Sequence, residues 1–456
     1  MSWNGKRVVV IGAARQGLAL TRYLVNRGAQ VVLTDAQPAE ELINAREELA
    51  GLSVEWVTGG HPLTLLDGAD LVCPSGGVPL TIPMVLEAQK RGIPLSNDSQ
   101  IFIEAAPCLV VGITGSAGKT TTTTLMGRIA NQAAKAGLYR KAFVGGNIGS
   151  PLIRQLDQIS PEDLVVVELS SFQLEIMRSS PQVAAILNLS PNHLDRHGTM
   201  AAYIQAKKNI FSHQTKSNTL VLGIEDTRAW QLAGEAHGEV LAFGRALPDG
   251  QSGSLVHEGH IWVRRGAEQQ AVIPLDEISL RGDHNLLNVL AACALSLALD
   301  LPAQVIRAGI QGFGGVEHRL EFVREINGVQ WYNDSKATSP EMAVTAMQAF
   351  SERLVVLAGG RDKALPWDEF ARQAAKRARA VIAFGEAAGI ISAAYPNSTV
   401  CQGLEQAVEL AVEAAKTGDV VLLAPGGTSF DDYVDYEARG RHFKQLVNDL
   451  PVKERD

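Results

Sequence analysis

The stretch WYNDSKATSPE (residues 331–341) closes an apolar segment and gathers carboxylate, ammonium, amide and hydroxyl groups within a few positions. Asp334, Lys336 and Thr338 lie directly after a predicted strand, a common location for ligand-binding side chains in α/β proteins. A surface turn followed by a helix from Pro340 would use the same residue types. The density of functional groups favours a ligand site, whose chemistry depends on the rest of the chain.

A second stretch, GITGSAGKTT (residues 112–121), is typical of a phosphate-binding loop. An apolar strand (residues 109–113) enters the glycine-rich turn and a helix follows, so backbone N–H groups can surround phosphate oxygens. Lys119 supplies a positive charge, and Thr120 can hold Mg²⁺ through its hydroxyl. The usual G-x-x-x-x-G-K-[ST] spacing is not met, because its first glycine falls on Ile113. We interpret the remaining G-x-x-G-K-T-T pattern as a nucleotide site rather than a plain strand-to-helix turn.

Acidic and imidazole groups follow the next two predicted strands. Glu168 ends the apolar run LVVVE, where a carboxylate can reach a phosphate-bound Mg²⁺. His193 and Asp195, in NHLDRHG, could ligate a metal or hold a phosphate. No cysteine or closely spaced histidine completes a tetrahedral zinc set. Lys207, farther along, is by the residues alone a weak candidate, since a lysine on an amphipathic helix is usually at the surface.

The N-terminal stretch VVVIGAARQGLA loosely matches a dinucleotide-binding pattern. Gly12 and Gly17 fit, with Asp35 about 20 residues beyond, but Ala14 replaces the glycine that allows close approach of a pyrophosphate. We therefore expect a Rossmann-like block that binds a nucleotide diphosphate, and NAD(P) is disfavoured.

Other polar positions have two interpretations each. Asn285 and Asn288, at the start of an apolar helix, could cap it or contact an adenine. Arg319 and Lys363 are either exposed charges or ligand contacts. The run APGGTSF (residues 424–430), between a strand and a helix, could bind an anion through backbone N–H groups.

These candidates lie in three successive α/β blocks of short apolar strands, glycine-rich turns and amphipathic helices. We predict an α/β protein of three domains. They are a Rossmann-like N-terminal domain (1–106), a central P-loop ATPase-type domain (107–315) and a C-terminal Rossmann-like α/β domain (316–456).

Bulk properties exclude several classes of function. The chain has 456 residues, 46% of them apolar, and a net charge of −8, which argues against nucleic-acid or anionic-membrane partners. The most apolar helix candidate is too short to span a bilayer, and the N-terminal residues lead straight into a strand without a signal pattern. Four scattered cysteines fit reduced thiols, so we expect a cytoplasmic protein. We also expect a monomer.

The order of these motifs resembles the Mur ligase family, whose members use ATP to add amino acids to UDP-linked muramyl precursors of peptidoglycan. The resemblance runs through all three blocks and includes the P-loop variant, the strand glutamate, the H-x-D-x-H-G segment with Y-x-x-A-K, the G-x-H-N-x-x-N helix start and an H-R pair. The segment NDSKATSP resembles the D-glutamate-adding members. The resemblance therefore implies transfer of D-glutamate to UDP-N-acetylmuramoyl-L-alanine through an acyl phosphate, with ADP and phosphate as the other products.

The resemblance also implies site residues. It places two Mg²⁺ ions, bound by Thr120, Glu168, His193 and a Lys207 that CO₂ has carbamylated; only the alignment of YIQAK selects Lys207 over Lys208. The catalytic set is Lys119, Glu168, His193, Lys207 and Lys336. The implied ATP contacts are Gly115, Ser116, Ala117, Gly118, Lys119, Thr120, Thr121, Asn285, Asn288, Arg319 and Asp334. The implied substrate contacts are Gly12, Gly17, Asp35, Ser75, Gly76, Gly77, Asn147, Thr338, Lys363, Ser429 and Tyr436. In WYNDSKATSPE, Ser335, Ser339 and Glu341 are left for capping the helix start.

The chain departs from the family pattern at a few positions. Ala117 stands where asparagine is usual, Asn192 stands where an acid is common, and Ala36 and Gln37 follow Asp35. Two other hypotheses remain open. A folylpolyglutamate synthase-like L-glutamate ligase would lack the Rossmann-like block before the P-loop, and a non-catalytic ATP-binding scaffold would leave Glu168 and His193 without a role.

Overall fold

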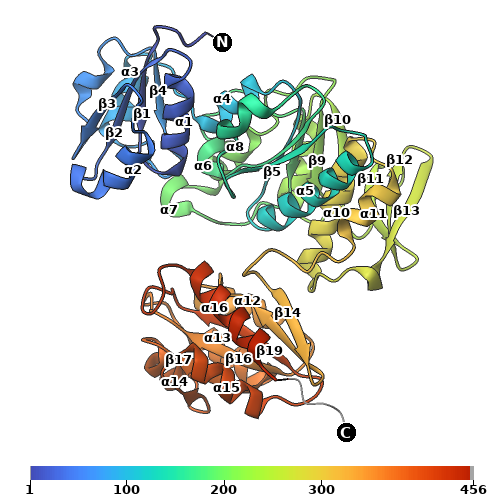
Figure 1. Cartoon of the computed structure of the whole chain (residues 1–456). Helices are drawn as coiled ribbons and strands as arrows, with labels where there is room; N and C mark the ends of the chain where they lie inside the picture. Colours follow the sequence, from blue (N-terminus) through green and yellow to red (C-terminus); the bar gives the residue numbers. More distant parts are fainter. Residues whose placement is uncertain (1, 452–456) are drawn as a thin grey trace. The chain divides into compact units, whose positions relative to one another are not determined.

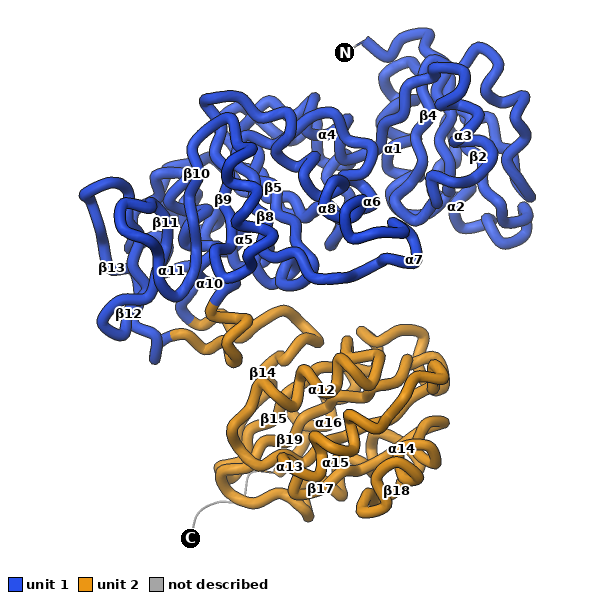
Figure 2. Tube along the Cα trace, turned by 180° about the vertical axis from the view of Figure 1, so that it is seen from behind, with its two compact units in different colours: residues 1–277, 287–311 blue, residues 278–286, 312–456 orange. Residues whose placement is uncertain are grey.

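The computed structural model describes residues 2–451 and contains three β-sheets (Figure 1). The chain divides into two compact units, each described below by itself (Figure 2). Unit 1 comprises residues 1–277 and 287–311, and unit 2 comprises residues 278–286 and 312–456. The first two sheets belong to unit 1 and the third to unit 2. The predicted α/β fold class with three domains is confirmed.

The first sheet is parallel and has the strand order β3-β2-β1-β4. Its central strand β1 reads RVVVI and is almost wholly buried, as expected for a parallel strand covered on both faces. The strands are β1 (Arg7–Ile11), β2 (Gln30–Asp35), β3 (Val54–Thr58) and β4 (Leu71–Pro74). The helices are α1 (Arg15–Val25), α2 (Ile43–Glu48), α3 (Pro83–Lys90) and α4 (Asp98–Ala105), with 3₁₀ turns η1 (Ala39–Leu42) and η2 (Leu63–Leu66).

The second sheet has nine strands in the order β13-β12-β11-β10-β9-β8-β5-β7-β6. Seven strands, β5 to β11, are parallel. Strands β12 and β13 add an antiparallel meander at one edge. The strands are β5 (Leu109–Thr114), β6 (Ala142–Gly146), β7 (Leu164–Glu168), β8 (Val183–Ile186), β9 (Thr219–Gly223), β10 (Glu239–Phe243), β11 (Gly253–His257), β12 (His260–Arg265) and β13 (Glu268–Pro274). The helices are α5 (Lys119–Lys135), α6 (Ser171–Leu174), α7 (Leu194–His197), α8 (Met200–Lys208), α9 (Thr227–Gln231), α10 (Asp283–Ala298) and α11 (Ala303–Ile310), with 3₁₀ turns η3 (Leu152–Gln158), η4 (Leu232–Glu235) and η5 (Leu275–Glu277).

The third sheet has the order β14-β15-β19-β16-β17-β18, and only β14 is antiparallel to its neighbour. Successive residues of β16 pack into different cores: Val356 faces one cluster, while Val355 and Leu357 face the other. This alternation indicates helices on both faces of the sheet. The strands are β14 (Glu321–Ile326), β15 (Val329–Asn333), β16 (Leu354–Gly359), β17 (Ala378–Phe384), β18 (Thr399–Val400) and β19 (Val420–Gly426). The helices are α12 (Pro340–Gln348), α13 (Asp368–Arg377), α14 (Ala388–Ala394), α15 (Leu404–Ala414) and α16 (Tyr436–Asp449).

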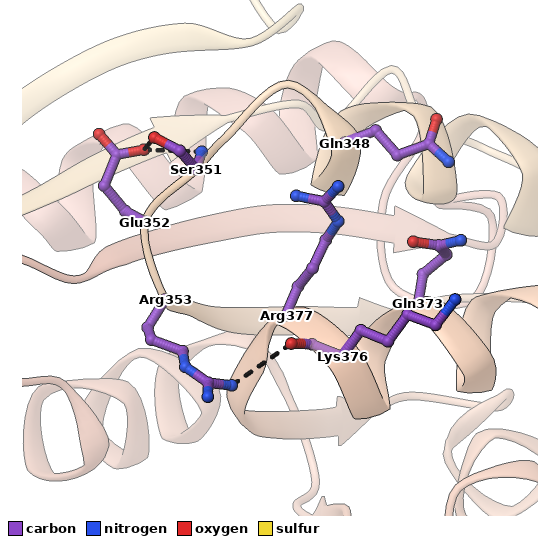
Figure 3. A pocket seen from close by; sticks show the side chains of 7 residues that line it. All are labelled: Gln348, Ser351, Glu352, Arg353, Gln373, Lys376 and Arg377. Atoms are coloured by element: carbon purple, nitrogen blue, oxygen red, sulfur yellow. Dashed lines mark hydrogen bonds between the residues drawn. The ribbon is translucent and has the colours of Figure 1, made fainter.

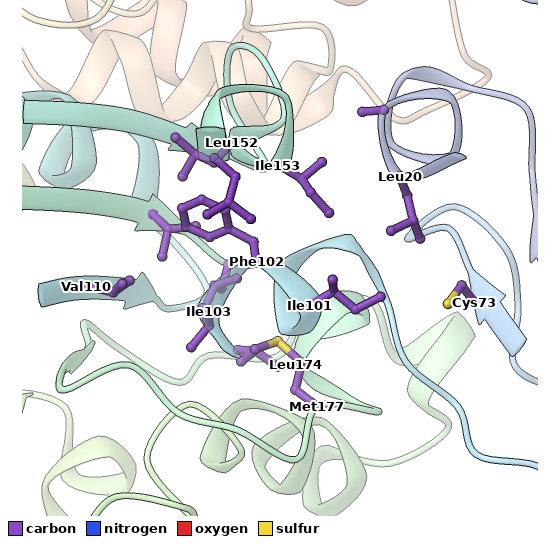
Figure 4. Packing of buried hydrophobic residues seen from close by; sticks show 14 of the residues in the cluster. Leu20, Cys73, Ile101, Phe102, Ile103, Val110, Leu152, Ile153, Leu174 and Met177 are labelled. Atoms are coloured by element: carbon purple, nitrogen blue, oxygen red, sulfur yellow. The ribbon is translucent and has the colours of Figure 1, made fainter. Parts of the chain in front are cut away.

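Within unit 1, α4 joins the cores of the first two sheets (Figure 4). Ile101 and Phe102 are 3% and 1% exposed, and they belong to one apolar cluster with Leu20 of α1 and Leu152 of η3. Asn97 caps α4 by accepting the Gln100 N–H at 2.8 Å. The cluster contains buried residues from both sheets and therefore joins their cores.

The described part of the chain contains no helix long and apolar enough to cross a membrane. All four cysteines are buried and carry free thiols.

Candidate functional site

The predicted phosphate loop connects β5 to α5. Gly115 has φ of +158° and Gly118, the N-cap of α5, has φ of +83°, in the region that favours glycine. A Cβ on Gly118 would lie 2.2 Å from Oδ1 of Asn288, so the turn has no room for a side chain. Lys119 begins α5, and its Nζ donates to the carbonyl oxygens of Gly115 at 2.9 Å and Ser116 at 3.2 Å. The ammonium is therefore held beside the loop in which phosphate oxygens would be received.

Side chains after β8 anchor the same loop. The Ser116 hydroxyl donates to the Ser190 carbonyl at 2.8 Å and lies 2.9 Å from the Tyr203 hydroxyl. The Ala117 N–H donates to Asn188 Oδ1 at 2.8 Å. The backbone at Ala117, where the family asparagine is missing, is thus held by an asparagine from the neighbouring strand end.

Two threonines continue the loop into the first turn of α5. Thr120 is half-buried and Thr121 is buried. A Thr120 hydroxyl at this point, next to Lys119, is in the position from which P-loop proteins coordinate Mg²⁺.

Glu168 ends β7, directly beside β5 in the sheet, where its Cα pairs with that of Ile113. Its side chain is 1% exposed. Oε1 accepts the Asn147 Nδ2–H at 2.8 Å, whereas Oε2 is buried without a hydrogen-bond partner. An unpaired buried carboxylate oxygen is costly unless a cation satisfies it, so this atom fits a divalent metal.

His193 has a left-handed backbone (φ 52°) and precedes the short helix α7. Its ring centroid is 4.9 Å from that of Phe172. Phe172 lies on α6, the short helix that comes after β7 and Glu168. Burial, and secondarily the nearby Lys119 and Lys207, lowers the pKa of His193. A neutral imidazole is the form that binds metals. Residues 2–451 contain no group of three or more His, Cys, Asp or Glu side chains that could hold a metal, so a metal here would also need hydroxyl or other oxygen ligands.

Lys207 and Lys208 differ sharply, although they are adjacent on α8. Lys207 is 1% exposed, and its Nζ donates to Thr114 Oγ1 at 3.1 Å and to the Gly115 carbonyl at 2.9 Å. Burial first, and then Lys119, lowers its pKa well below that of a free lysine. Lys208 instead forms an ion pair with Glu235. Only Lys207 therefore lies at the phosphate loop.

Asn285 and Asn288 lie inside α10, which begins at Asp283, so of the two interpretations given to them the one as helix caps is wrong. The Asn285 amide donates to the Arg281 carbonyl at 2.7 Å. The Asn288 Oδ1 accepts from the Thr122 hydroxyl at 3.3 Å and packs on Gly118. Asn288 thus belongs to the phosphate-loop surroundings in unit 1.

The N-terminal candidates gather at the carboxyl ends of β1, β2 and β4. Gly12 has φ of +98°, and a Cβ on Gly17 would lie 1.9 Å from the Gly12 carbonyl oxygen, so both glycines are required. Asp35 accepts the N–H groups of Ala13 at 2.6 Å and Gln37 at 2.9 Å. Its carboxylate therefore shapes the loop.

Residues 75–77 follow β4 at the same end of the sheet. The Ser75 hydroxyl donates to the Gly12 carbonyl at 3.2 Å. The carbonyls of Gly76 and Val78 accept from Arg196, at 3.0 and 2.7 Å. A Cβ on Gly77 would meet no atom within 4 Å.

Arg196 is a residue that the sequence analysis missed. Besides those two carbonyls, its guanidinium carbon lies 3.9 Å from the centroid of Phe172, the ring that also packs on His193. The side chain therefore connects the loop after β4 with the segment that carries His193. The charge in LDRHG was visible in the sequence, but its partners 118 and 120 residues away were not.

In unit 2, the polar stretch follows β15. Asp334 is 6% exposed, and its Oδ1 accepts the Leu320 N–H at 3.1 Å. Burial raises its pKa to about 6, partly opposed by that hydrogen bond, Arg319 and Lys336. Arg319 is half-buried. The Lys336 Nζ lies 5.6 Å from the centroid of the Tyr436 ring, so these two candidates are neighbours.

The remaining candidates follow β15, β19 and β16. Thr338 is half-buried, and its N–H donates to the Lys336 carbonyl at 2.9 Å. Ser429 follows β19 and is 2% exposed, and Lys363 follows β16 and is exposed. Because β15, β19 and β16 are neighbours in that order, the three loops meet at one sheet edge, the usual location of ligands in open α/β sheets.

The capping prediction for this stretch is partly wrong. Ser339 caps α12, accepting the Met342 N–H at 3.4 Å. Ser335 does not cap: it is fully buried, and its hydroxyl donates to the Tyr436 carbonyl at 2.8 Å while accepting from Arg439.

A cavity of about 720 Å³ lies at the opposite edge of the third sheet (Figure 3). Its lining residues precede β16 and β17, and none is a predicted site residue. They are Gln348, Ser351, Glu352, Arg353, Gln373, Lys376 and Arg377.

Three family models match the chain in succession. They are the Mur ligase MurD-like N-terminal domain (residues 6–97), the Mur ligase middle domain (113–296) and the Mur ligase glutamate ligase domain (318–427). A UDP-N-acetylmuramoylalanine--D-glutamate ligase from Symbiobacterium thermophilum is 43% identical, and the match covers 98% of each chain. One of the same name from Acidobacterium capsulatum is 41% identical over 98% of this chain and 97% of the relative.

Among solved structures, the UDP-N-acetylmuramate-alanine ligase MurC of Thermotoga maritima has a TM-score of 0.56. It is 18% identical, with 97% of this chain and 99% of that chain covered, and so shares the fold. These two relatives match over nearly the whole chain at more than 40% identity, and all three domain models occur in order. The chain belongs to the Mur ligase family.

Proposed function

We propose that this protein is an ATP-dependent ligase that joins D-glutamate to UDP-N-acetylmuramoyl-L-alanine in peptidoglycan precursor synthesis. The observation that carries the proposal is the match over nearly the whole chain to ligases of that name. The same reaction gives a role to groups that a scaffold would not need, above all the buried Glu168 oxygen and the buried Lys207 amine.

The first step is phosphoryl transfer. An oxygen of the alanine carboxylate attacks the γ-phosphorus of ATP, the bond to the β-phosphate oxygen breaks, and ADP leaves. Such catalysis is mostly positioning and charge neutralisation. Backbone N–H groups from Gly115 to Thr121 and the Lys119 ammonium would hold the phosphates. Lys119 would exchange its two loop carbonyls for phosphate oxygens. Asn288, packed against the same loop, supports an adenine or loop-positioning role.

The second step forms the amide. The neutral amine of D-glutamate attacks the acyl carbon, and the tetrahedral adduct expels inorganic phosphate and loses a proton. Lys336 would stabilise the charge on the acyl phosphate. Thr338, Lys363, Ser429 and the backbone near Tyr436 would bind the two glutamate carboxylates, which need cationic and hydroxyl donors.

Mg²⁺, when bound, neutralises phosphate charge. We propose two ions, held by Thr120, Glu168, His193 and Lys207. An amine cannot ligate Mg²⁺ in this way, but a carbamate can. The deprotonated Lys207 amine would attack CO₂, forming an N–C bond and releasing a proton. Its burial and lowered pKa favour the neutral amine.

The remaining parts of the proposal concern the nucleotide ends and the assembly. Asn285, Arg319 and Asp334 would serve ATP. The UDP part would bind in the first domain at Gly12, Gly17, Asp35 and residues 75–77, and Asn147 would orient the alanine end. We further propose domains at 1–106, 107–315 and 316–456, a monomer, and a cytoplasmic location without nucleic-acid or membrane partners.

The experiment is a phosphate-release assay with protein, ATP, Mg²⁺ and UDP-N-acetylmuramoyl-L-alanine. D-glutamate, L-glutamate, L-lysine or meso-diaminopimelate is added in parallel, with folate and L-glutamate as a further arm. We expect selective release with D-glutamate. Release that D-glutamate does not raise, or that requires folate, would refute the proposal, and ATP binding without any turnover would favour the scaffold.

A further inference from the structure

Arg439 of α16 is a fully buried cation that the proposed reaction does not use. Its Nε–H donates to Ser335 Oγ at 3.0 Å, and Nη2 donates to the Ser335 carbonyl at 2.9 Å. Nη2 also reaches the Gly427 carbonyl at 3.2 Å, and Nη1 reaches the Thr428 carbonyl at 3.2 Å. One guanidinium therefore joins the loop after β15 to the loop after β19.

This placement is energetically demanding. Within residues 2–451 the guanidinium forms no ion pair, and its partners are carbonyl and hydroxyl oxygens. Desolvation lowers the pKa of Arg439 to about 10, with Asp431 and Tyr433 opposing the shift, so the group stays charged at neutral pH. A buried charge without a directly paired counter-charge is destabilising compared with an apolar side chain. The retained cation calls for a function that packing alone does not provide.

The two joined loops carry the residues assigned to the incoming amino acid. Ser335 lies next to Lys336 and three residues before Thr338, and residues 427–428 immediately precede Ser429. The third loop is also constrained, because a Cβ on Gly360 would lie 2.7 Å from the Arg439 Nη1. The loop that leads from Gly360 to Lys363 thus packs on the same guanidinium.

We propose that Arg439 is a positioning residue that fixes the spacing of the three amino-acid-binding loops and thereby sets the affinity for D-glutamate. It acts through the backbone, without touching the substrate. The inference rests on the proposed function. Lysine cannot replace it, because one ammonium cannot span both loops as the planar guanidinium does.

The test compares R439K and R439M with wild type in the phosphate-release assay, titrating each substrate separately. We expect the KM for D-glutamate to rise about tenfold or more in both variants, since small displacements of positioning groups are costly. The KM values for ATP and UDP-N-acetylmuramoyl-L-alanine should change less than about threefold. The matched control is R379M, which breaks the Arg379–Asp419 pair at the opposite edge of the same sheet and should leave all three KM values unchanged.

A merely structural role would give a different result. R439K and R439M would then show a lower melting temperature and a lower kcat in proportion to the folded fraction, with all KM values unchanged, and the inference would be wrong. If R439M does not fold, S335A removes only the hydroxyl acceptor and should still raise the D-glutamate KM several-fold; an unchanged KM would overturn the inference. Wild type without D-glutamate dependence would refute the proposed function instead.

Discussion

Lys207 and Lys208 allow the proposed carbamate to be tested with two neighbouring alanine substitutions. Lys207→Ala removes a buried amine at the phosphate loop, whereas Lys208→Ala removes an amine paired with Glu235 near the surface. Both substitutions shorten one lysine of the same helix, so each controls for the other. We expect the first to abolish turnover and the second to leave it nearly unchanged.

The magnitude follows from charge. A free lysine, with a pKa near 10.4, is neutral in only about one molecule in 2,500 at pH 7, and each unit by which burial lowers the pKa multiplies that fraction about tenfold. Carbamylation then turns an ammonium into an anion. One unit charge lost about 4 Å from a cation, at an effective dielectric constant near 20, costs about 4 kcal/mol. That corresponds to about a thousandfold in kcat.

The assay measures phosphate release in CO₂-depleted buffer and in buffer with added bicarbonate. Wild type should be activated by bicarbonate, and ¹³C-bicarbonate should produce a carbamate signal in the wild-type spectrum. Lys207→Ala should lack both responses and should be partly restored by acetate or another small carboxylate, which can occupy the vacated space as an anion.

Three results would refute this reasoning. They are Lys207→Ala retaining more than about a tenth of wild-type turnover, a carbamate signal that persists in that variant, and loss of activity in Lys208→Ala alone. The melting temperature of Lys207→Ala is measured as a control for loss of folding. We expect it to be at least that of wild type. Native burial depresses the lysine pKa, so the unfolded state binds the proton more tightly. The stability lost by burying the protonated amine is greatest below the native pKa. It shrinks as the pH rises above that value and is absent above the unfolded-state pKa of about 10.4.

Three further predictions address other groups. Glu168→Gln should lower kcat about a thousandfold, because the amide leaves the metal without the buried anion. The kcat is measured at saturating Mg²⁺, and a loss below tenfold would contradict a role of Glu168 as metal ligand. Arg196→Met should raise the KM for the UDP substrate by about tenfold, because the variant loses the hydrogen bonds that the charged guanidinium donates to the loop after β4. A KM equal to that of wild type would argue against a role of Arg196 in holding residues 76–78. Asp334→Asn should be more stable than wild type at pH 7.5, by up to about 3 kcal/mol, because burial raises the pKa of Asp334 from 3.8 to about 6 and penalises the ionised form. This difference should vanish as the pH falls through 6 to below 4 in urea-unfolding curves, and a difference independent of pH would contradict the cause.

The sequence predicted those parts of the fold and site that depend on local pattern. The apolar run before Gly115 and the run ending at Glu168 specify buried parallel strands, and a polar residue at such a strand end lies at the ligand-binding edge whatever the topology. The helix start at Pro340 and its cap Ser339 were equally local. The antiparallel meander β11–β13 was missed because short strands interrupted by glycine lack a clear period.

Other features depend on partners far away in the chain. Ser335 was misassigned because the residue that binds its hydroxyl, Arg439, lies 104 positions later. Burial of Lys207 rather than Lys208 follows from how α8 packs, which its weak amphipathic pattern does not specify. For Arg439 a signal did exist. It lies four residues before Phe443 and eight before Val447, on the buried face of α16, so an arginine at that position was a sign of an internal network.

The side-chain nitrogens of Lys119 and Lys207 both donate to the single carbonyl oxygen of Gly115. This arrangement has a consequence for protein engineering. A redesign that rewards only thermal stability would replace Lys207 with methionine, because that change removes both a buried amine and its repulsion with Lys119. The resulting protein would be more thermostable and would have no ligase activity. Libraries built to stabilise this chain should therefore hold Lys207 fixed and seek their gains away from the phosphate loop.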